Sequence, residues 1–164
     1  MRDPGQYKLA AKLIFERFVE QLEPIGFSRT RKNFLVRLRP HWVDFIRASC
    51  PPLHRDYQLH ASVRILNDDF AGAGIVGPST QAFDRRFNLW FVDSPDSIVR
   101  CAAEMGAWVS TVALPWFDAQ STEALLGAQS PLSPNTRSAL AAALAGRSVP
   151  DNVRLSRRIL GLES

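Results

Sequence analysis

Two stretches of the sequence decide the fold: residues 34–49, FLVRLRPHWVDFIRAS, and residues 57–65, YQLHASVRI. Apolar and polar side chains alternate along both stretches, which is the period-two pattern of a β-strand. In the first stretch, Pro40 and His41 interrupt the alternation and are expected to form a turn. The pattern therefore predicts a β-hairpin followed by a further strand of the same antiparallel sheet.

A two-residue turn at Pro40 and His41 fixes which side chains of the hairpin face each other. On one side of the sheet, Arg37 is expected to oppose Asp44, and Arg39 to oppose Trp42. On the other side the expected pairs are apolar, Val36 with Phe45 and Leu38 with Val43. An ion pair, a guanidinium over an indole and two apolar contacts are all pairs that a sheet favours.

The alternation assigns the remaining side chains to two faces. We expect one face to be apolar and covered by helices, with Val36, Val43, Phe45, Leu59 and Val63. The opposite face would combine basic, aromatic and acidic groups, namely Arg37, Arg39, Trp42, Asp44, His60 and Arg64. These six residues are the predicted binding surface, and the plainest alternative is that they form the hydrated side of a half-buried sheet.

Helical periodicity surrounds the strands. Residues 6–23 have an apolar stripe typical of an amphipathic helix, and Ser94 with Pro95 begins a second helix that contains Trp108. Residues 67–86 are expected to form a long loop before the apolar run 87–92, and three shorter helices follow Ser121. The predicted fold is α+β: an antiparallel sheet of four or more strands with helices on one face and C-terminal helices at an edge or over the second face.

Composition sets limits on the class of protein. With 164 residues and 46% hydrophobic side chains, the chain is expected to form a single domain, residues 1–164, with residues 128–164 as a helical C-terminal extension. The net charge is +4, a mild bias that solubility alone tolerates. Two cysteines and the lack of an apolar leader or a long apolar run predict a cytoplasmic protein without a membrane span.

Several features together resemble a known bacterial family. These are Ile25-Gly-Phe27 after the first helix, the hairpin, the strand at 57–65, and a Trp-bearing helix that ends at Leu114-Pro-Trp-Phe117. In this order they resemble the family called domain of unknown function 4304 over roughly residues 8–126. The resemblance implies an α+β fold and transfers no catalytic residue, because the family has no established chemistry. Residues 64–66, Arg-Ile-Leu, depart from the more polar ending expected for that strand.

No spacing in the chain identifies a reaction or a cofactor. Residues 72–77 fit G-x-G-x-x-G formally, but a dinucleotide site needs that motif between a strand and a helix, and Pro78 follows it. The leading hypothesis is a non-enzymatic module that binds an acidic protein partner through the six-residue face. Two alternatives stay open: single-stranded nucleic-acid binding by the same face, and a small hydrolase or metal-dependent enzyme that uses His60, His54 and Asp44.

Overall fold

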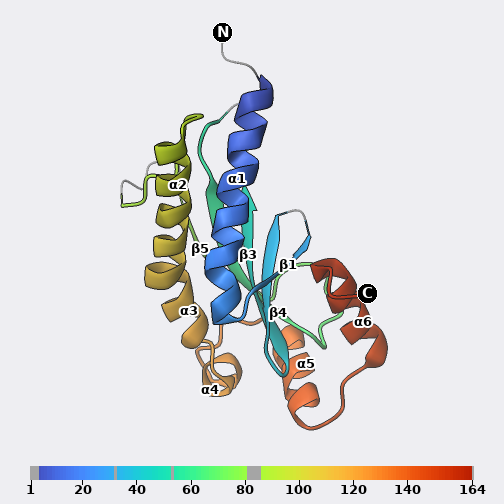
Figure 1. Ribbon diagram of the computed structural model, residues 1–164. Coiled ribbons are helices and arrows are strands. Elements are labelled where there is room, and N and C mark those ends of the chain that lie inside the picture. The colour runs from blue at the N-terminus through green and yellow to red at the C-terminus, as the bar shows by residue number, and fades with distance from the viewer. Residues whose placement is uncertain (1–3, 32, 53, 81–85, 164) are drawn as a thin grey trace.

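The computed structural model describes residues 4–31, 33–52, 54–80 and 86–163. It has an α+β fold, in which five antiparallel strands form one sheet in the order β1-β2-β3-β4-β5 (Figure 1). The strands are β1 (Ser28–Arg31), β2 (Phe34–Leu38), β3 (Trp42–Ser49), β4 (Gln58–Ile65) and β5 (Ile75–Ser79). The longer helices are α1 (Pro4–Leu22), α2 (Pro95–Trp108), α5 (Pro134–Leu144) and α6 (Pro150–Leu160).

Short helical segments connect the longer elements. A 3-10 turn, η1 (Glu23–Ile25), ends α1, and Gly26 follows it with φ 94°. The π-helical turn η2 (Val109–Ala113) joins α2 to α3 (Leu114–Asp118), and α4 (Thr122–Leu126) comes next. Ser94, Ser121 and Ser133 each accept a hydrogen bond from a backbone N–H at the start of α2, α4 and α5. The start of α2 at Ser94 and Pro95 agrees with the sequence prediction.

The helix layer covers one face of the sheet, here called the front face. On this face α1 and α2 run side by side (Figure 1). Their buried side chains, such as Phe18 and Met105, join one apolar core with the strand residues Leu35, Trp42, Ile46, Leu59 and Val63. The opposite face, here called the back face, carries Val36, Val43 and Phe45. Burial of this core is the main stabilising contribution to the fold.

The register of the β2–β3 hairpin confirms the prediction. Arg37 pairs with Asp44, Val36 with Phe45, and Leu38 with Val43. Beyond the last of these pairs, the backbone N–H of Arg39 donates to the carbonyl of Trp42 at 2.8 Å, which closes the turn at Pro40 and His41. The alternation of side chains was therefore sufficient to place both strands of the hairpin.

The predicted assignment of faces is wrong at the next strand. Asp44 pairs with Val63, and Val43 pairs with Arg64, so that β4 presents Leu59 and Val63 to the front face rather than to the side of Val43. A shift of one residue in pairing moves every side chain of a strand to the other face. Arg37, Asp44 and Trp42 consequently lie on the helix-covered face, whereas His60 and Arg64 lie on the back face.

Burial explains why this register forms. Both sides of the hairpin carry apolar side chains, but only the odd-numbered positions of β4 are uniformly apolar, with Leu59, Ala61, Val63 and Ile65 all fully buried. Packing these four beside Ile46 and Ala48 makes one continuous apolar face for α1 and α2. The predicted covering of Val36, Val43 and Phe45 by the first helix and the Trp108 helix is therefore incorrect.

Two further segments differ from the prediction. The expected loop 67–86 contains strand β5, in which Ile75 is buried on the front face and Val76 is exposed on the back face. The apolar run 87–92 forms no named strand, and Trp90 makes only an isolated bridge with Asp56. Strand β1 was not predicted, because its sequence Ser-Arg-Thr-Arg has no apolar alternation.

The C-terminal helices belong to the same fold. Leu160 of α6 packs on Val36 and Val43, so α6 covers part of the back face. A polar network fixes α5 and α6 to the end of β4: the Asn67 side chain donates to the carbonyl of Ala139 at 2.8 Å and accepts from the N–H of Val149 at 2.7 Å. Asp68 accepts from the hydroxyl of Thr136 at 2.8 Å. Helices α5 and α6 lie beside β1 and β4 in Figure 1.

In the described part of the chain, no helix is long and apolar enough to cross a membrane.

Candidate functional site

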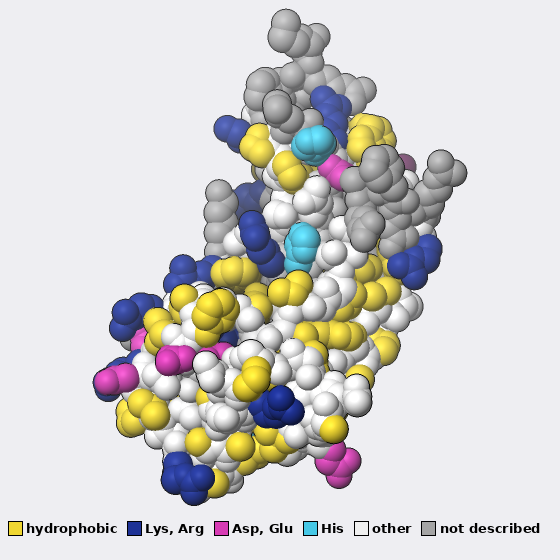
Figure 2. Space-filling model, turned by 180° about the vertical axis from the view of Figure 1, so that it is seen from behind, with side chains coloured by type: hydrophobic (Ala, Val, Ile, Leu, Met, Phe, Trp, Pro, Cys, Tyr) yellow, Lys and Arg dark blue, Asp and Glu magenta, His cyan; other side chains and the backbone are white. Residues whose placement is uncertain are grey.

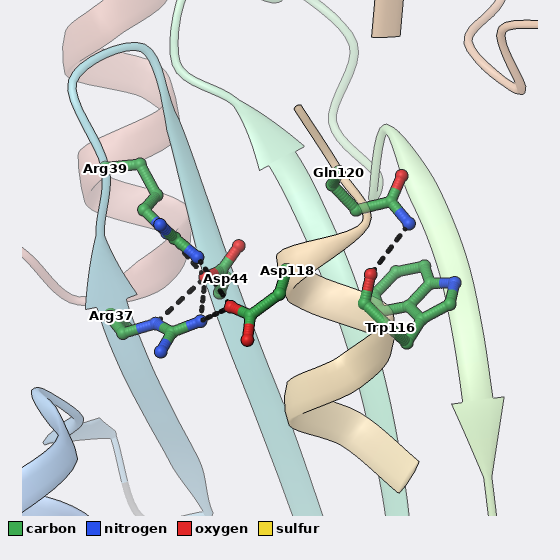
Figure 3. Close-up of polar contacts among 6 residues, drawn as sticks. All are labelled: Arg37, Arg39, Asp44, Trp116, Asp118 and Gln120. Atoms are coloured by element: carbon green, nitrogen blue, oxygen red, sulfur yellow. Dashed lines mark hydrogen bonds and ion pairs between the residues drawn. The ribbon is translucent and has the colours of Figure 1, made fainter. Parts of the chain in front are cut away.

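A cluster of two arginines and two aspartates lies on the front face, at the end of the hairpin (Figure 3). The buried carboxylate oxygen Oδ2 of Asp44 accepts from Arg37 Nε at 3.0 Å, from Arg37 Nη2 at 2.8 Å and from Arg39 Nε at 2.9 Å. Asp118, at the end of α3, lies farther away: its Oδ1 is 3.7 Å from Arg37 Nη2 and 3.5 Å from Arg39 Nη2. We call these four residues the arginine–aspartate cluster.

Aromatic rings hold the Arg37 side chain in place. Its guanidinium carbon lies 5.0 Å from the centre of the Phe27 ring and 5.8 Å from that of Phe117. Both rings are fully buried, and their centres are 6.0 Å apart. A guanidinium that stacks on aromatic rings while it forks onto a carboxylate has little freedom to rotate. Arg37 is therefore fixed by two kinds of contact at once.

The π-helical turn η2 brings α3 to the cluster. The N–H of Leu114 donates to the carbonyl of Val109, five residues earlier, and Pro115 follows with no N–H to donate. A π turn inside a helix accommodates such a missing donor. The helix continues into α3, which places Phe117 in the core and Asp118 beside the arginines. In the sequence, the Ser94 cap, the helical spacing and Pro115 predicted where the helix that contains Trp108 starts and ends. They did not predict the π turn.

Trp116 of α3 packs against the edge strand β5. A Cβ atom at Gly77 of β5 would lie 2.5 Å from the Trp116 ring, so only glycine permits this close approach. The side-chain amide of Gln120 donates to the Trp116 carbonyl at 2.9 Å (Figure 3). Gly77, the last glycine of the formal G-x-G-x-x-G pattern, therefore has a packing role.

Two buried polar atoms of this region have no hydrogen-bond partner within the described residues: Trp42 Nε1 and Asp44 Oδ1. All three arginine hydrogen bonds go to the other oxygen of Asp44. Trp42 itself is buried in the main core at 8% exposure. The prediction that the Trp42 indole lies on an exposed binding surface is therefore wrong, because helices cover that side of the strand.

Arg64 is also buried, on the back face beneath α6. Its guanidinium donates to the Ser156 hydroxyl at 2.9 Å and to the carbonyls of Gly72 and Asp68. Burial lowers the pKa of this guanidinium, and the nearby Asp68 opposes that shift. Arg64 thus links the end of β4 to the C-terminal helix and presents no surface to a partner.

The structure separates the six predicted surface residues into three environments. Arg37, Arg39 and Asp44 meet in the cluster, Trp42 and Arg64 are buried on opposite faces, and His60 alone lies on an open sheet surface. A single basic and aromatic face made of all six does not exist. The prediction of that face assumed a register between β3 and β4 that the structure does not have.

The open surface lies on the half of the back face that α6 leaves uncovered. A row of side chains crosses four neighbouring strands there, because Phe34 pairs with Arg47, Arg47 with His60, and His60 with Ser79. Arg47 is exposed and the other three are partly exposed. Figure 2 shows this side of the molecule, with histidine and Lys or Arg side chains around its middle and hydrophobic groups between them. We call these four residues the back-face row.

Neighbouring side chains extend the back-face row. Ser49 and Gln58, a cross-strand pair, lie next to it toward the end of the strands, and both are partly exposed. On the other side, Phe45 packs edge-on against Phe34, with ring centres 5.8 Å apart. Val76 of β5 lies beyond them and is 76% exposed. The surface therefore combines an aromatic pair, a cation, an imidazole and uncharged polar groups.

The electrostatics of the row depend on Arg47. No carboxylate forms an ion pair with Arg47 in the part of the chain that the structure describes. Burial lowers the pKa of His60 from its ordinary value of 6.5, and the positive charge of Arg47 lowers it further. His60 is therefore mainly neutral at pH 7, and Arg47 supplies the charge of the row.

The residues proposed for hydrolytic or metal chemistry do not converge. Asp44 lies on the front face and His60 on the back face, on paired strands but on opposite sides of the sheet. His54 lies in the connection after β3, where its carbonyl accepts a hydrogen bond from the Tyr7 hydroxyl. No group of three His, Cys, Asp or Glu residues is placed to hold a metal ion among the described residues. Asp44, His54 and His60 therefore do not come together as one site in the structure.

Searches against protein-family models, curated proteins and solved structures gave no match. The resemblance to domain of unknown function 4304 is therefore untested and stays a prediction.

Proposed function

We propose that this protein is a non-enzymatic binding module whose back-face row engages an acidic segment of a protein partner. The observation that carries the proposal is Arg47, an exposed guanidinium without a carboxylate partner among the described residues, held in one row with Phe34 and His60. Arginine and aromatic side chains are typical anchors of protein interfaces. An unpaired arginine attracts carboxylates without having to break an internal ion pair first.

Sheet geometry supports this surface over the predicted one. The residues of the row stand on regular strands, so their spacing is fixed before a partner binds, which lowers the entropy cost of binding. His60 can add a second positive charge when a carboxylate approaches, because an anion favours the protonated imidazole. Ser79 within the row, and Ser49 and Gln58 beside it, offer hydrogen-bond donors.

Single-stranded nucleic acid is the second candidate, and the Phe34–Phe45 pair is the observation that favours it. Aromatic side chains on an open sheet stack nucleobases in several single-strand binding folds. Both rings are only partly exposed, and they pack edge to face with an interplanar angle of 85°. That packing uses much of the surface a base would need, so the acidic protein segment is preferred.

The two free thiols, Cys50 and Cys101, support a reducing compartment such as the cytoplasm as the place of action.

A titration with two probes tests the proposal: a short polyglutamate peptide and an oligothymidine of similar charge, both at low salt. We expect the peptide to bind and Arg47→Glu to weaken its binding at least about tenfold, as loss of a charged anchor at an interface does. Arg147→Glu is the matched control, because Arg147 is exposed in the connection between α5 and α6 and the substitution changes the net charge equally.

Equal losses of peptide affinity in Arg47→Glu and Arg147→Glu would show that net charge alone is responsible. That result would overturn the proposed surface. Preference for the oligothymidine, with a steep salt dependence that Arg47→Glu removes, would instead assign the row to nucleic acid.

A further inference from the structure

The arginine–aspartate cluster contains an internal carboxylate that is held weakly. Asp118 Oδ1 lies 3.5 and 3.7 Å from the two Nη2 atoms, beyond the usual length of a charge-assisted hydrogen bond. The side chain of Asp118 is 68% exposed. Exposed ion pairs of this kind contribute about 0–1 kcal/mol. Asp118 therefore fills a position near both arginines without binding them tightly.

The arginines themselves are held firmly by other groups. Asp44 fixes both Nε atoms at 2.9–3.0 Å, and Phe27 with Phe117 stacks on Arg37. Arg37 Nη2 also donates to Asp44, at 2.8 Å. This atom and Arg39 Nη2 both lie near the same outer position, where Asp118 now lies (Figure 3). Arg37 and Arg39 keep 18% and 32% of their side-chain surface exposed. Two guanidinium groups oriented in advance form a typical carboxylate site.

The charge of the cluster favours an added anion once Asp118 moves away. Arg37, Arg39 and Asp44 together carry a net charge of +1, and Asp118 brings it to zero. Asp44 is completely buried, whereas Asp118 ends a five-residue helix at the surface. An external carboxylate can therefore replace Asp118 without disturbing the buried ion pair.

We propose that Arg37 and Arg39 form a binding site for a carboxylate ligand, and that Asp118 fills this site in the free protein. The ligand is either a small free acid or an acidic side chain of another protein, and both present the same chemical group. This site lies on the front face and is independent of the back-face row, so that either can fail without the other.

Two probes distinguish the sources of the carboxylate: succinate and a short polyglutamate peptide, each titrated while the side-chain Nε–H signals of Arg37 and Arg39 are followed by NMR. We expect Asp118→Asn to tighten the binding of at least one probe about threefold, because the substitution removes a competitor of weak ion-pair strength. Arg39→Gln should abolish the shifts of the Arg37 signal. Tighter binding of the peptide than of succinate would indicate a protein segment, and the reverse a small acid.

Asp151→Asn is the matched control, because Asp151 is an exposed aspartate that pairs with Arg154 on α6, away from the cluster. It should leave both affinities unchanged. Because Asp118 is exposed, Asp118→Asn should fold normally, and its melting temperature verifies this. Unchanged affinity in Asp118→Asn relative to the wild type, or ligand shifts that do not include Arg37 and Arg39, would overturn the proposal.

Discussion

Arg37 and Asp44 face each other across β2 and β3 and form a hydrogen-bonded ion pair inside the helix-covered side of the sheet. Asp44 has no exposed surface, and its partner arginine stacks on two buried aromatic rings. The arginines donate three hydrogen bonds to Asp44 Oδ2, whereas Oδ1 has no partner among the described residues. Removal of one member of a buried charged pair leaves the other charge without a partner. Arg37 thus joins the hairpin to Phe117 and Asp118 of α3.

Asp44→Ala should destabilise the fold strongly. The loss leaves Arg37 and Arg39 without their common acceptor, and breaking one partner of a buried pair costs about 3–5 kcal/mol. Urea unfolding of the two proteins measures the difference. Asp118→Ala is the matched comparison, since Asp118 contacts the same arginines from the surface, and it should lose at most about 1 kcal/mol relative to the wild type. Similar losses in both variants would show that burial of Asp44 is not the cause.

Acid should destabilise the protein through His60. Its pKa is lowered in the folded state, chiefly by burial, so the unfolded chain binds a proton more readily. The contribution is therefore present above the ordinary pKa of 6.5 and is lost as the pH falls below it. His60→Gln should lose less stability than the wild type between about pH 7.5 and about pH 5.5 in urea unfolding. Parallel pH curves for the two proteins would exclude His60 as a source of this dependence.

Asn67→Ala should loosen the two C-terminal helices. The substitution leaves the Ala139 carbonyl and the Val149 N–H without their side-chain partner, and each such group costs about 1–3 kcal/mol. Hydrogen exchange should become faster in α5 and α6 before it changes in α1. The control is Asn88→Ala, because the Asn88 side chain is exposed. Unchanged protection of α5 and α6 would mean that apolar contacts alone, such as those of Leu160, hold these helices.

Binding of an acidic peptide should strengthen at lower pH. A carboxylate beside Arg47 favours protonated His60, whose pKa is lowered in the free protein by burial and by Arg47. Polyglutamate should therefore bind more tightly at about pH 6 than at about pH 8, and His60→Gln should reduce this difference. Calorimetric titration at the two pH values provides the measurement. A pH dependence that persists unchanged in His60→Gln would place the protonated group elsewhere.

Local sequence determined much of the fold. Alternation and Pro40 predicted the hairpin register, and Ser94 with Pro95 predicted the start of α2, because both signals act over a few neighbouring residues. The pairing of β4 was not predictable in this way. Eight residues, 50–57, separate it from β3, so no tight turn fixes the register, and the choice depends on which apolar face the helices cover.

The candidate site could be predicted only in part for the same reason. The contact between Arg37 and Asp44 followed from the hairpin, whereas Asp118 and Phe117 reach it through a π turn that has no simple sequence pattern. Arg47 was overlooked, although it alternates with Ile46 and Ala48 and pairs with His60. A correct register between β3 and β4 would have placed Arg47 and His60 together and separated both from Asp44.

The location of bound polyglutamate on the uniformly labelled protein, mapped by amide NMR shifts, tests the proposed binding surface most directly. We expect the largest shifts at Phe34, Arg47, His60 and Ser79, with the amides of α1 and α2 unchanged, and loss of these shifts in Arg47→Glu. Shifts confined to the helix layer, or shifts in the row that persist in Arg47→Glu, would contradict the assignment of the back-face row as the binding surface.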